Sequence, residues 1–169
     1  MDNIKLIPLK IEYAEELLGL WNNESVMKYT YLDTIDTAEQ AKGRIDYWLK
    51  QYSSKTFPNH FVILKEETVV GVAGLPIIRK EPFCCGMYYQ VMEAYQRQGI
   101  ATRVAELLKS KVLEKYPEGR IVTSCTSSNE GSKKVLLRNG FVYSETKVGA
   151  FERKGFIDDV EKYVFINNK

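Results

Sequence analysis

The chain has 169 residues, of which 44% are hydrophobic and 27% are charged, and its formal net charge is +2. This composition is ordinary for a globular protein, so we expect one domain over residues 1–169 with a buried core. The small net charge argues against a nucleic-acid or anionic-membrane partner.

The longest apolar run covers residues 69–78, contains two glycines and a proline, and is about half as long as a membrane-spanning helix. The N-terminus shows no secretory leader pattern. The three cysteines have no metal-ligand spacing and form no even disulfide set. We therefore expect no metal site and a reducing, cytoplasmic location.

The first third of the chain predicts one strand followed by two helices. Residues 4–9 are strand-like, and residues 11–22 carry apolar side chains on one helical face. A second helix is expected to begin at Thr37, because Thr37 and Gln40 have the spacing of a capping box. Its apolar positions recur with helical spacing as far as Tyr52.

The middle of the chain predicts a β-meander. Residues 61–64 and 68–76 are strand-like and flank a short polar turn, which is typical of a hairpin. A break is expected over residues 77–82, and residues 83–91 predict the third strand.

A strand–helix–strand unit is expected next. A helix over about residues 99–116 is stopped by Pro117. The β-branched segment 120–126 is then expected to run parallel to the strand that precedes this helix, because a long crossover connects the two.

The last part of the chain predicts a short helix and two strands. Ser128 or Asn129 is the expected cap of the helix, and Gly140 suits the left-handed position at its end. Strands are expected at residues 141–151 and 160–166, joined by a polar segment over residues 152–159.

The join between the meander and the long helix is the most informative segment for function. It runs from Gln96 to Thr102 and connects a strand to a helix N-terminus. Backbone N–H groups at a helix start lack intrahelical partners, and the helix dipole adds partial positive charge, so the segment predicts an anion site. Gly99 and Ala101 let a phosphate approach the backbone, and Arg97 supplies a cation.

Two common phosphate motifs do not fit this segment. The phosphate loop of NTPases needs two glycines followed by Lys and then Ser or Thr, whereas Gly99 is the only glycine here. The dinucleotide fingerprint needs three glycines after the first strand of a doubly wound sheet, and this segment follows about the fourth strand.

A third pattern fits. Residues Gln96 to Ala101 resemble the pyrophosphate-binding signature of the GNAT superfamily of N-acetyltransferases: Gln or Arg, two variable residues, Gly, one variable residue, and Gly or Ala. A second block of that family is Asn-x-x-Ser followed by a short helix and Gly-Phe. Asn129 to Ser132 match its first part, and Gly140 and Phe141 match its second.

The resemblance covers nearly the whole chain and implies a fold. That fold is α/β (α+β), with a central, mixed, mostly antiparallel sheet of about seven strands flanked by about four helices. Looser matches in residues 20–27, and at Asp159 and Tyr163, are similar to the branch related to ribosomal-protein N-terminal acetyltransferases.

The same resemblance implies acetyl-coenzyme A as the donor. Arg97 would contribute to binding the pyrophosphate, which follows the signature residue Gln96. The backbone amides that would hold it are those of Gln98, Gly99, Ile100, Ala101 and Thr102.

The resemblance also assigns the pantetheine arm of the donor. This arm would pair like an extra strand against Gln90, Val91 and Met92, using main-chain hydrogen bonds. Asn129 would hydrogen-bond the pantetheine, and Ser132 would lie near the sulfur.

Acetyl transfer to an amine needs a proton acceptor for the ammonium, a donor for the thioester oxygen and a donor for the leaving thiolate. The resemblance implies that a backbone N–H at Val91 or Met92 serves the oxygen. The tyrosine that several relatives use as the acid is replaced by Leu136. The acid is therefore expected to be Ser132, another tyrosine such as Tyr143, or solvent.

The proton acceptor is less well defined. Some relatives carry a glutamate early on the central strand, but the corresponding position is about Gly86, which leaves Glu93 and Glu24 as candidates. The only histidine is His60, and it is distant in sequence from the cysteines. Direct transfer in a ternary complex is therefore expected rather than an acyl-enzyme.

Each candidate also has a plain structural explanation. Asn129 can be only a helix cap, Ser132 a surface residue of a helix, and Glu24 and Glu93 surface charges. The missing tyrosine and strand glutamate support an alternative function, in which the domain is a non-catalytic sensor that binds acyl-coenzyme A.

The acceptor is expected to be a primary amine, either a protein N-terminus or a small amine such as a polyamine, an amino acid or a drug. Residues 22–33 and 152–159 are expected to shape its pocket, because loops beside a donor site carry specificity. Trp21, Tyr29 and Tyr31 could line this cleft or pack against the first helix. The sequence leaves a monomer and a homodimer equally open.

Overall fold

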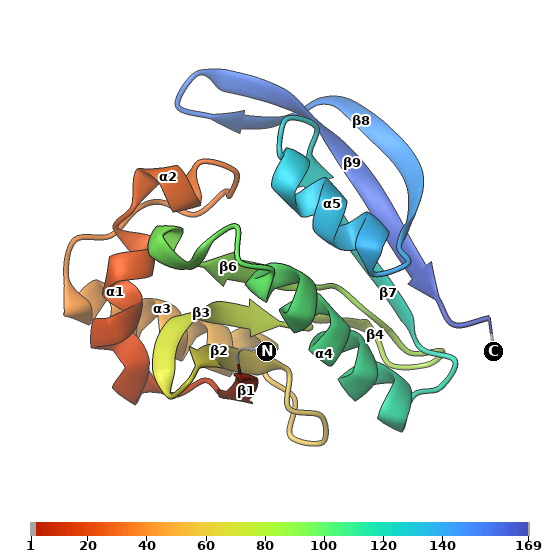
Figure 1. The fold of residues 1–169 in the computed structure, drawn as a ribbon, viewed down its shortest axis with the longest axis horizontal. Helices are drawn as coiled ribbons and strands as arrows, with labels where there is room; N and C mark the ends of the chain where they lie inside the picture. Colours follow the sequence, from red (N-terminus) through yellow and green to blue (C-terminus); the bar gives the residue numbers. More distant parts are fainter. Residues whose placement is uncertain (1–2, 169) are drawn as a thin grey trace.

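The computed structural model describes residues 3–168 and divides its strands between two sheets (Figure 1). The first sheet is antiparallel and has the order β1-β2-β3-β6. Its strands are β1 (Ile4–Pro8), β2 (His60–Lys65), β3 (Thr68–Gly74) and β6 (Tyr88–Val91). The second sheet has the order β4-β5-β7-β9-β8. Its strands are β4 (Ile77–Arg79), β5 (Cys84–Cys85), β7 (Arg120–Thr126), β8 (Val142–Arg153) and β9 (Phe156–Ile166).

The helices cover both faces of the first sheet and one face of the second. Among residues 3–168 they are α1 (Ala14–Trp21), α2 (Glu24–Met27), α3 (Ala38–Tyr52), α4 (Ile100–Lys115) and α5 (Glu130–Arg138). Two short 3-10 helices, η1 (Ile11–Tyr13) and η2 (Glu93–Tyr95), precede α1 and follow β6. Figure 1 shows α4 in front of the first sheet, α3 behind it, and α5 against β7 and β9. None of these helices is long and apolar enough to cross a membrane.

The first sheet separates two hydrophobic clusters. On one face Ile63 packs in a cluster with Leu108 of α4, and on the other Val62 packs in a cluster with Trp21 of α1. Successive side chains of a strand point to opposite faces, so a strand buried on both sides is continuously apolar rather than alternating. Burying each such aliphatic side chain contributes about 1.5–3 kcal/mol. The first sheet is therefore held rigidly from both faces, and its edge strand with it.

Local signals predicted two helix ends correctly. At the start of α3, the Thr37 hydroxyl accepts from the Gln40 amide at 3.2 Å, and the Gln40 side chain accepts from the Thr37 amide at 3.0 Å. At the end of α5, Gly140 has φ +79° and the Phe141 amide donates to the Leu136 carbonyl at 3.1 Å. Both ends are set by neighbours in sequence.

Two expectations for the second sheet were wrong. Residues 77–79 form β4 and pair with β5, where a break was expected. Residues 152–159 are no polar link, because β8 and β9 continue through them to a tight turn at Lys154 and Gly155. These two residues have φ values of +49° and +81°, which suit the two-residue turn that matches the twist of a hairpin.

The strand predicted over residues 83–91 is divided between the two sheets. β5 pairs in parallel with β7, as expected, whereas β6 pairs with β3. At the division the Gly86 amide donates to the Pro76 carbonyl at 2.7 Å, and the Thr123 hydroxyl donates to the Met87 carbonyl at 2.9 Å. Beyond this point no described strand pairs with the far edge of β6. The two sheets therefore part beside β6.

Candidate functional site

The open edge of β6 presents the backbone groups of alternate residues. The Met92 amide donates to the Val70 carbonyl of β3 at 2.8 Å, so the amides of Met92 and Gln90 point toward β3. In an antiparallel ladder the groups of Tyr89 and Val91 then point the other way, toward the opening. Of the two predicted donors for a thioester oxygen, only the Val91 N–H faces the opening.

The neighbourhood of β6 holds this edge in place. The Val91 carbonyl accepts from Gln96 Nε2 at 3.0 Å, and the Gln90 side chain accepts from Trp21 Nε1 at 2.9 Å. On the β3 side, a Cβ at Gly71 would lie 2.0 Å from the Gln90 carbonyl oxygen. No side chain fits there, so Gly71 allows β3 and β6 to approach as closely as they do.

The start of α4 follows this edge after η2 and a short loop. Its N-cap residue is Gly99, which has φ +78° and no side chain to cap the helix, and a Cβ there would meet nothing within 4 Å. The first backbone bond of the helix runs from the Arg103 amide to the Gly99 carbonyl at 3.1 Å. The amides of Ile100, Ala101 and Thr102 precede it and have no intrahelical partner. They face open space at the positive end of the helix dipole, in a first turn without acidic residues.

The side chains of the loop before α4 differ in their freedom. Gln98 is braced, because its Nε2 donates to the Ala94 carbonyl at 3.3 Å and its Oε1 accepts from Lys65 Nζ at 2.8 Å. Arg97 is exposed, has φ +62°, and makes no hydrogen bond or ion pair with residues 3–168. Arg97 is therefore the cation of this loop that an incoming anion can engage.

Across the opening from β6 lies the first turn of α5. The Asn129 side-chain oxygen accepts from the Ser132 amide at 3.2 Å, so Asn129 is indeed the helix cap. Its Nδ2 has no acceptor among the described residues and is free to donate to a ligand. The Ser132 hydroxyl lies 3.0 Å from the hydroxyl of Tyr89, so Ser132 is more than a surface residue. This contact joins α5 to β6.

Burial determines the protonation of the groups around Ser132. It raises the pKa of Tyr89 to about 12, although the bond to Ser132 opposes the shift, and it raises the pKa of the nearby Cys125 thiol to about 11. Both groups keep their protons at neutral pH. Tyr89 can therefore donate a proton or a hydrogen bond through Ser132, whereas Cys125 is a poor nucleophile.

Sequence reasoning did not identify Tyr89. Leu136, which occupies the position of the relatives' acidic tyrosine, is 1% exposed in the core, and Tyr143 is half exposed with its hydroxyl 2.7 Å from that of Thr146. The available signal was the alternation of Tyr88 and Tyr89 along one strand. Which of the two faces the opening depends on where the sheets part.

A cavity of about 480 Å³ lies beside the opening, between α2, the loop before α5 and the β8–β9 turn, whose tip is above α2 in Figure 1. Residues from both segments expected to shape an acceptor pocket line it. They include Glu24, Lys28, Tyr29, Arg153, Lys154 and Phe156.

The three aromatic residues predicted for this cleft have different positions. Tyr29 lines the cavity, whereas Trp21 is fully buried and packs edge-to-face on Trp48 at a centroid distance of 5.4 Å. Tyr31 packs its ring on Phe151 at 5.0 Å, outside the residues that line the cavity. The alternative of structural packing thus holds for Trp21 and Tyr31.

Ion pairs tie α2 to the β8–β9 turn. Arg153 donates from Nε and Nη2 to the two carboxylate oxygens of Glu24, both at 3.1 Å, and from Nη1 to the Leu32 carbonyl at 2.5 Å. Lys154 Nζ lies 2.9 Å from the same carboxylate. The hydrogen bonds from Arg153 and then Lys154 lower the pKa of Glu24 to about 2.

Glu93, the other candidate base, also has a lowered pKa. Its carboxylate accepts from Asn23 Nδ2 at 2.9 Å, which favours the ionised form, and Ser25 adds a second hydrogen bond. The hydrogen bond from Asn23 connects the segment after β6 to α2, because Asn23 is the N-cap of that helix. Neither Glu24 nor Glu93 has the raised pKa of a carboxylate poised near neutral pH.

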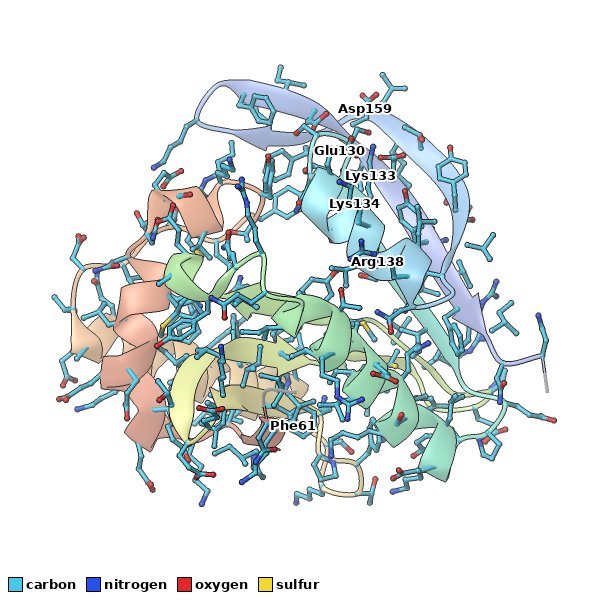
Figure 2. All side chains as sticks on the ribbon, viewed as in Figure 1. Phe61, Glu130, Lys133, Lys134, Arg138 and Asp159 are labelled. Carbon is cyan, nitrogen blue, oxygen red and sulfur yellow. The ribbon has the colours of Figure 1, made fainter. Side chains whose placement is uncertain are left out.

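Charged side chains follow one another along α5 (Figure 2). Lys133 is paired with Glu161 at 2.8 Å and with Glu130 at 3.3 Å. Lys134 and Arg138 form no ion pair with residues 3–168. Because the Asn139 side chain donates to the Thr102 carbonyl at 3.2 Å, this helix ends beside the start of α4.

The fold and the site together define the class of protein. A strand edge without a partner leads directly into a helix N-terminus that faces open space, with a polar cavity alongside, which suits a transferase for a donor with a long arm and phosphate groups. Residues 3–142 match the model of the acetyltransferase (GNAT) domain. The chain belongs to this family, and the predicted family and fold are confirmed. The name of the family agrees with the predicted enzyme class.

One curated protein and two solved structures illustrate what the chain is similar to. A ribosomal-protein-serine acetyltransferase of Escherichia coli is 26% identical over 124 residues, which cover 73% of this chain and 64% of that protein. A GNAT-family acetyltransferase structure from Bacillus anthracis superimposes with a TM-score of 0.84 at 15% identity, over 100% of both chains. A spermidine N-acetyltransferase from Vibrio cholerae, in complex with CoA and spermine, gives a TM-score of 0.85 at 15% identity, covering 98% of this chain and 96% of that one.

Proposed function

We propose that the protein transfers an acetyl group from acetyl-coenzyme A to a primary amine, by direct transfer in a ternary complex within one domain. The observation that carries the proposal is the open edge of β6, followed after η2 and a short loop by the N-terminus of α4, which no side chain caps. A pantetheine arm can add to such an edge by main-chain hydrogen bonds, and a pyrophosphate can bind such a helix start. No single side chain is needed for either contact.

The donor then makes contacts along the whole join. The Gln98 to Thr102 amides surround the pyrophosphate, with Arg97 pairing with its charge. The backbone groups of Tyr89 and Val91 hold the pantetheine, flanked by Gln90 and Met92. Asn129 Nδ2 reaches the same arm from the other side.

The chemical step forms a C–N bond and breaks the C–S bond of the thioester. The amine nitrogen attacks the carbonyl carbon while the Val91 N–H stabilises the oxygen, which becomes negative in the tetrahedral state. The leaving sulfur receives a proton from the Ser132 hydroxyl, which takes one from the Tyr89 phenol, and Tyr89 recovers its proton from water. The attacking nitrogen loses its proton to water, beside the ionised carboxylates of Glu93 and Glu24.

Direct transfer is favoured over an acyl-enzyme because the cysteines are poor nucleophiles. All three cysteines are buried and free. Burial raises the pKa of Cys85 to about 12 and that of Cys125 to about 11, so neither is a thiolate at neutral pH. Buried free thiols also suit a reducing, cytoplasmic setting, where we expect a monomer or homodimer without nucleic-acid or membrane partners.

Two measurements test the proposal. Thermal unfolding is followed with coenzyme A, ATP or NAD, and only coenzyme A should raise the midpoint. Release of free thiol from acetyl-coenzyme A is then followed with a panel of amines and peptides, and at least one should accelerate it. Stabilisation by coenzyme A without thiol release across the panel would favour the sensor function, which the lowered pKa values of Glu24 and Glu93 keep as the second candidate.

A further inference from the structure

The cavity beside α2 contains a lysine that no carboxylate neutralises at close range. Lys28 forms no ion pair within 4 Å among residues 3–168, and its ammonium lies 4.9 Å from the centroid of the Tyr29 ring. It interacts with Glu93 only over a longer distance, enough to lower the pKa of that carboxyl slightly further. Its hydrogen-bonding capacity is therefore unused.

Lys28 is exposed. The buried cation of the cavity wall, Arg153, is in contrast fully engaged. Arg153 is 9% exposed and uses Nε, Nη1 and Nη2 on Glu24 and on the carbonyl of Leu32. Lys154 shares the Glu24 carboxylate and is otherwise exposed. Two lysine ammonium groups thus face an incoming molecule, and only one of them has a counter-ion in contact.

The carboxylates near the cavity already have donors. Glu24 accepts from Arg153 and Lys154, and Glu93 accepts from Asn23. Asp158 accepts from the amide and hydroxyl of Ser128, at 2.9 and 2.5 Å, and from the Asp159 amide at 2.8 Å. A cationic ligand would have to compete with these donors, whereas an anionic ligand finds a free ammonium.

The position of the cavity relates this charge to the reacting amine. Ser128 lies in its wall and immediately precedes Asn129, the cap of α5, while Glu24 follows the residue that binds Glu93 beside β6. A molecule seated in the cavity therefore lies next to the end of β6 from which Val91 presents its N–H. Tyr29 and Phe156 add aromatic surface to the wall.

We infer that the acceptor amine belongs to a molecule that also carries a carboxylate, either an amino acid or a short acidic peptide, and that Lys28 binds this carboxylate. The inference rests on the proposed function and narrows its acceptor. It argues against a polyamine as the acceptor. A polyamine carries further ammonium groups, which the cationic side chains of Lys28, Arg153 and Lys154 in the cavity wall would repel.

The test uses acceptors that differ by one charge. C-terminally amidated dipeptides with glutamate or glutamine at the second position have closely similar amino groups and differ in their single carboxylate. Free amino acids are compared with their amides, and spermidine is the cationic reference. With acetyl-coenzyme A saturating, we expect kcat/KM to be about tenfold higher for the acidic dipeptide, as one charge-assisted hydrogen bond provides. The comparison of free amino acids with dipeptides distinguishes the two sources of the carboxylate.

Matched variants assign the effect to one side chain. Lys28→Met keeps the apolar stem and should remove the preference for the acidic dipeptide through KM, and Lys28→Glu should reverse it. Lys10→Met removes a lysine outside the cavity wall and should leave the preference unchanged. Amine turnover with no charge preference, or a preference that Lys28→Met preserves, would overturn the inference while leaving the proposed function intact.

A failure of catalysis gives a different result. If no amine is acetylated, the proposed function fails, and binding of the two dipeptides to the coenzyme A complex is measured by calorimetry. Tighter binding of the acidic dipeptide that is lost in Lys28→Met still supports the carboxylate site. Equal binding of both dipeptides contradicts it.

Discussion

The proposed donor side and the proposed acceptor side of this site are built in opposite ways. The donor side is one continuous segment, from β6 through the loop to the first turn of α4, and it offers mainly backbone N–H groups. The acceptor cavity is built from side chains of three separate segments, and the bond between Glu24 and Arg153 spans 129 positions of the chain. A site made of backbone N–H groups needs small residues that leave space for the ligand. A site made of side chains needs particular side chains from distant segments to come together.

The largest expected effect removes the donor side alone. Gly99→Val should abolish the rise in unfolding temperature that coenzyme A produces. A β-branched residue at φ +78° costs about 1–2 kcal/mol or more, and its side chain enters the space that the pyrophosphate needs. The control is Gly43→Ala, a helical glycine with equally open surroundings. Undiminished stabilisation of Gly99→Val by coenzyme A would show that the pyrophosphate binds elsewhere.

The next effect reaches the donor edge through the sheet. Gly71→Ala places a Cβ 2.0 Å from the Gln90 carbonyl oxygen, so β3 and β6 must move apart. We expect a loss of about 1–3 kcal/mol in the free energy of unfolding, typical of overpacking, together with weaker binding of coenzyme A. Urea denaturation and calorimetry measure the two effects. A variant with native stability would mean that β6 is not held as tightly as its pairing indicates.

A smaller effect separates chemistry from binding. Tyr89→Phe should lower kcat about tenfold without changing the affinity for coenzyme A, because it removes one hydrogen bond to Ser132 that matters when the thiolate leaves. The matched control is Tyr88→Phe, which removes the bond of 2.8 Å to His60 on the other face of the strand. That variant should lose stability rather than kcat. Equal kcat in the wild type and Tyr89→Phe would assign the proton to solvent.

The smallest effect concerns the acceptor side and pH. The pKa of Glu24 is about 2 in the folded protein against an ordinary 4.5, so its ion pairs stabilise the fold fully above pH 4.5. This contribution is lost as the pH falls from 4.5 toward 2, since the carboxylate must then be protonated. Denaturation midpoints of the wild type should fall over this interval more steeply than those of Glu24→Gln. Parallel curves would show that the contact with Arg153 does not couple to folding.

These variants also sharpen the contrast between the two sides. The substitutions at Gly99 and Gly71 should change donor binding, whereas Lys28→Met and Glu24→Gln should leave it unchanged. A change in coenzyme A affinity on altering Glu24 would mean that the cavity wall and the donor edge move together, through the bond that joins Asn23 to Glu93.

Much of the donor side was predictable because its determinants are close in sequence. The signature from Gln96 to Ala101 lies within six consecutive residues. Outside the donor side, the capping box at Thr37, the left-handed Gly140 and the hydrogen bonds that end α5 likewise involve residues within five positions of one another. A positive φ or a helix cap requires particular residue types at particular spacings, so such features can be predicted from a single sequence.

The acceptor side and the contact between Tyr89 and Ser132 were not predictable in the same way. That residues 83–91 divide between two sheets, that Tyr89 rather than Tyr88 meets Ser132, and that Arg153 clasps Glu24 depend on contacts between distant segments. The residue types alone constrain such contacts weakly, because many pairs of polar side chains could form an equivalent hydrogen bond or ion pair. The packing of the distant segments decides which pairs meet. Local sequence thus predicted a helix start suited to binding phosphate, and the family of the chain, because both depend on residues close together in sequence. Only the tertiary structure, by dividing residues 83–91 between two sheets, decided which groups surround the opening beside β6.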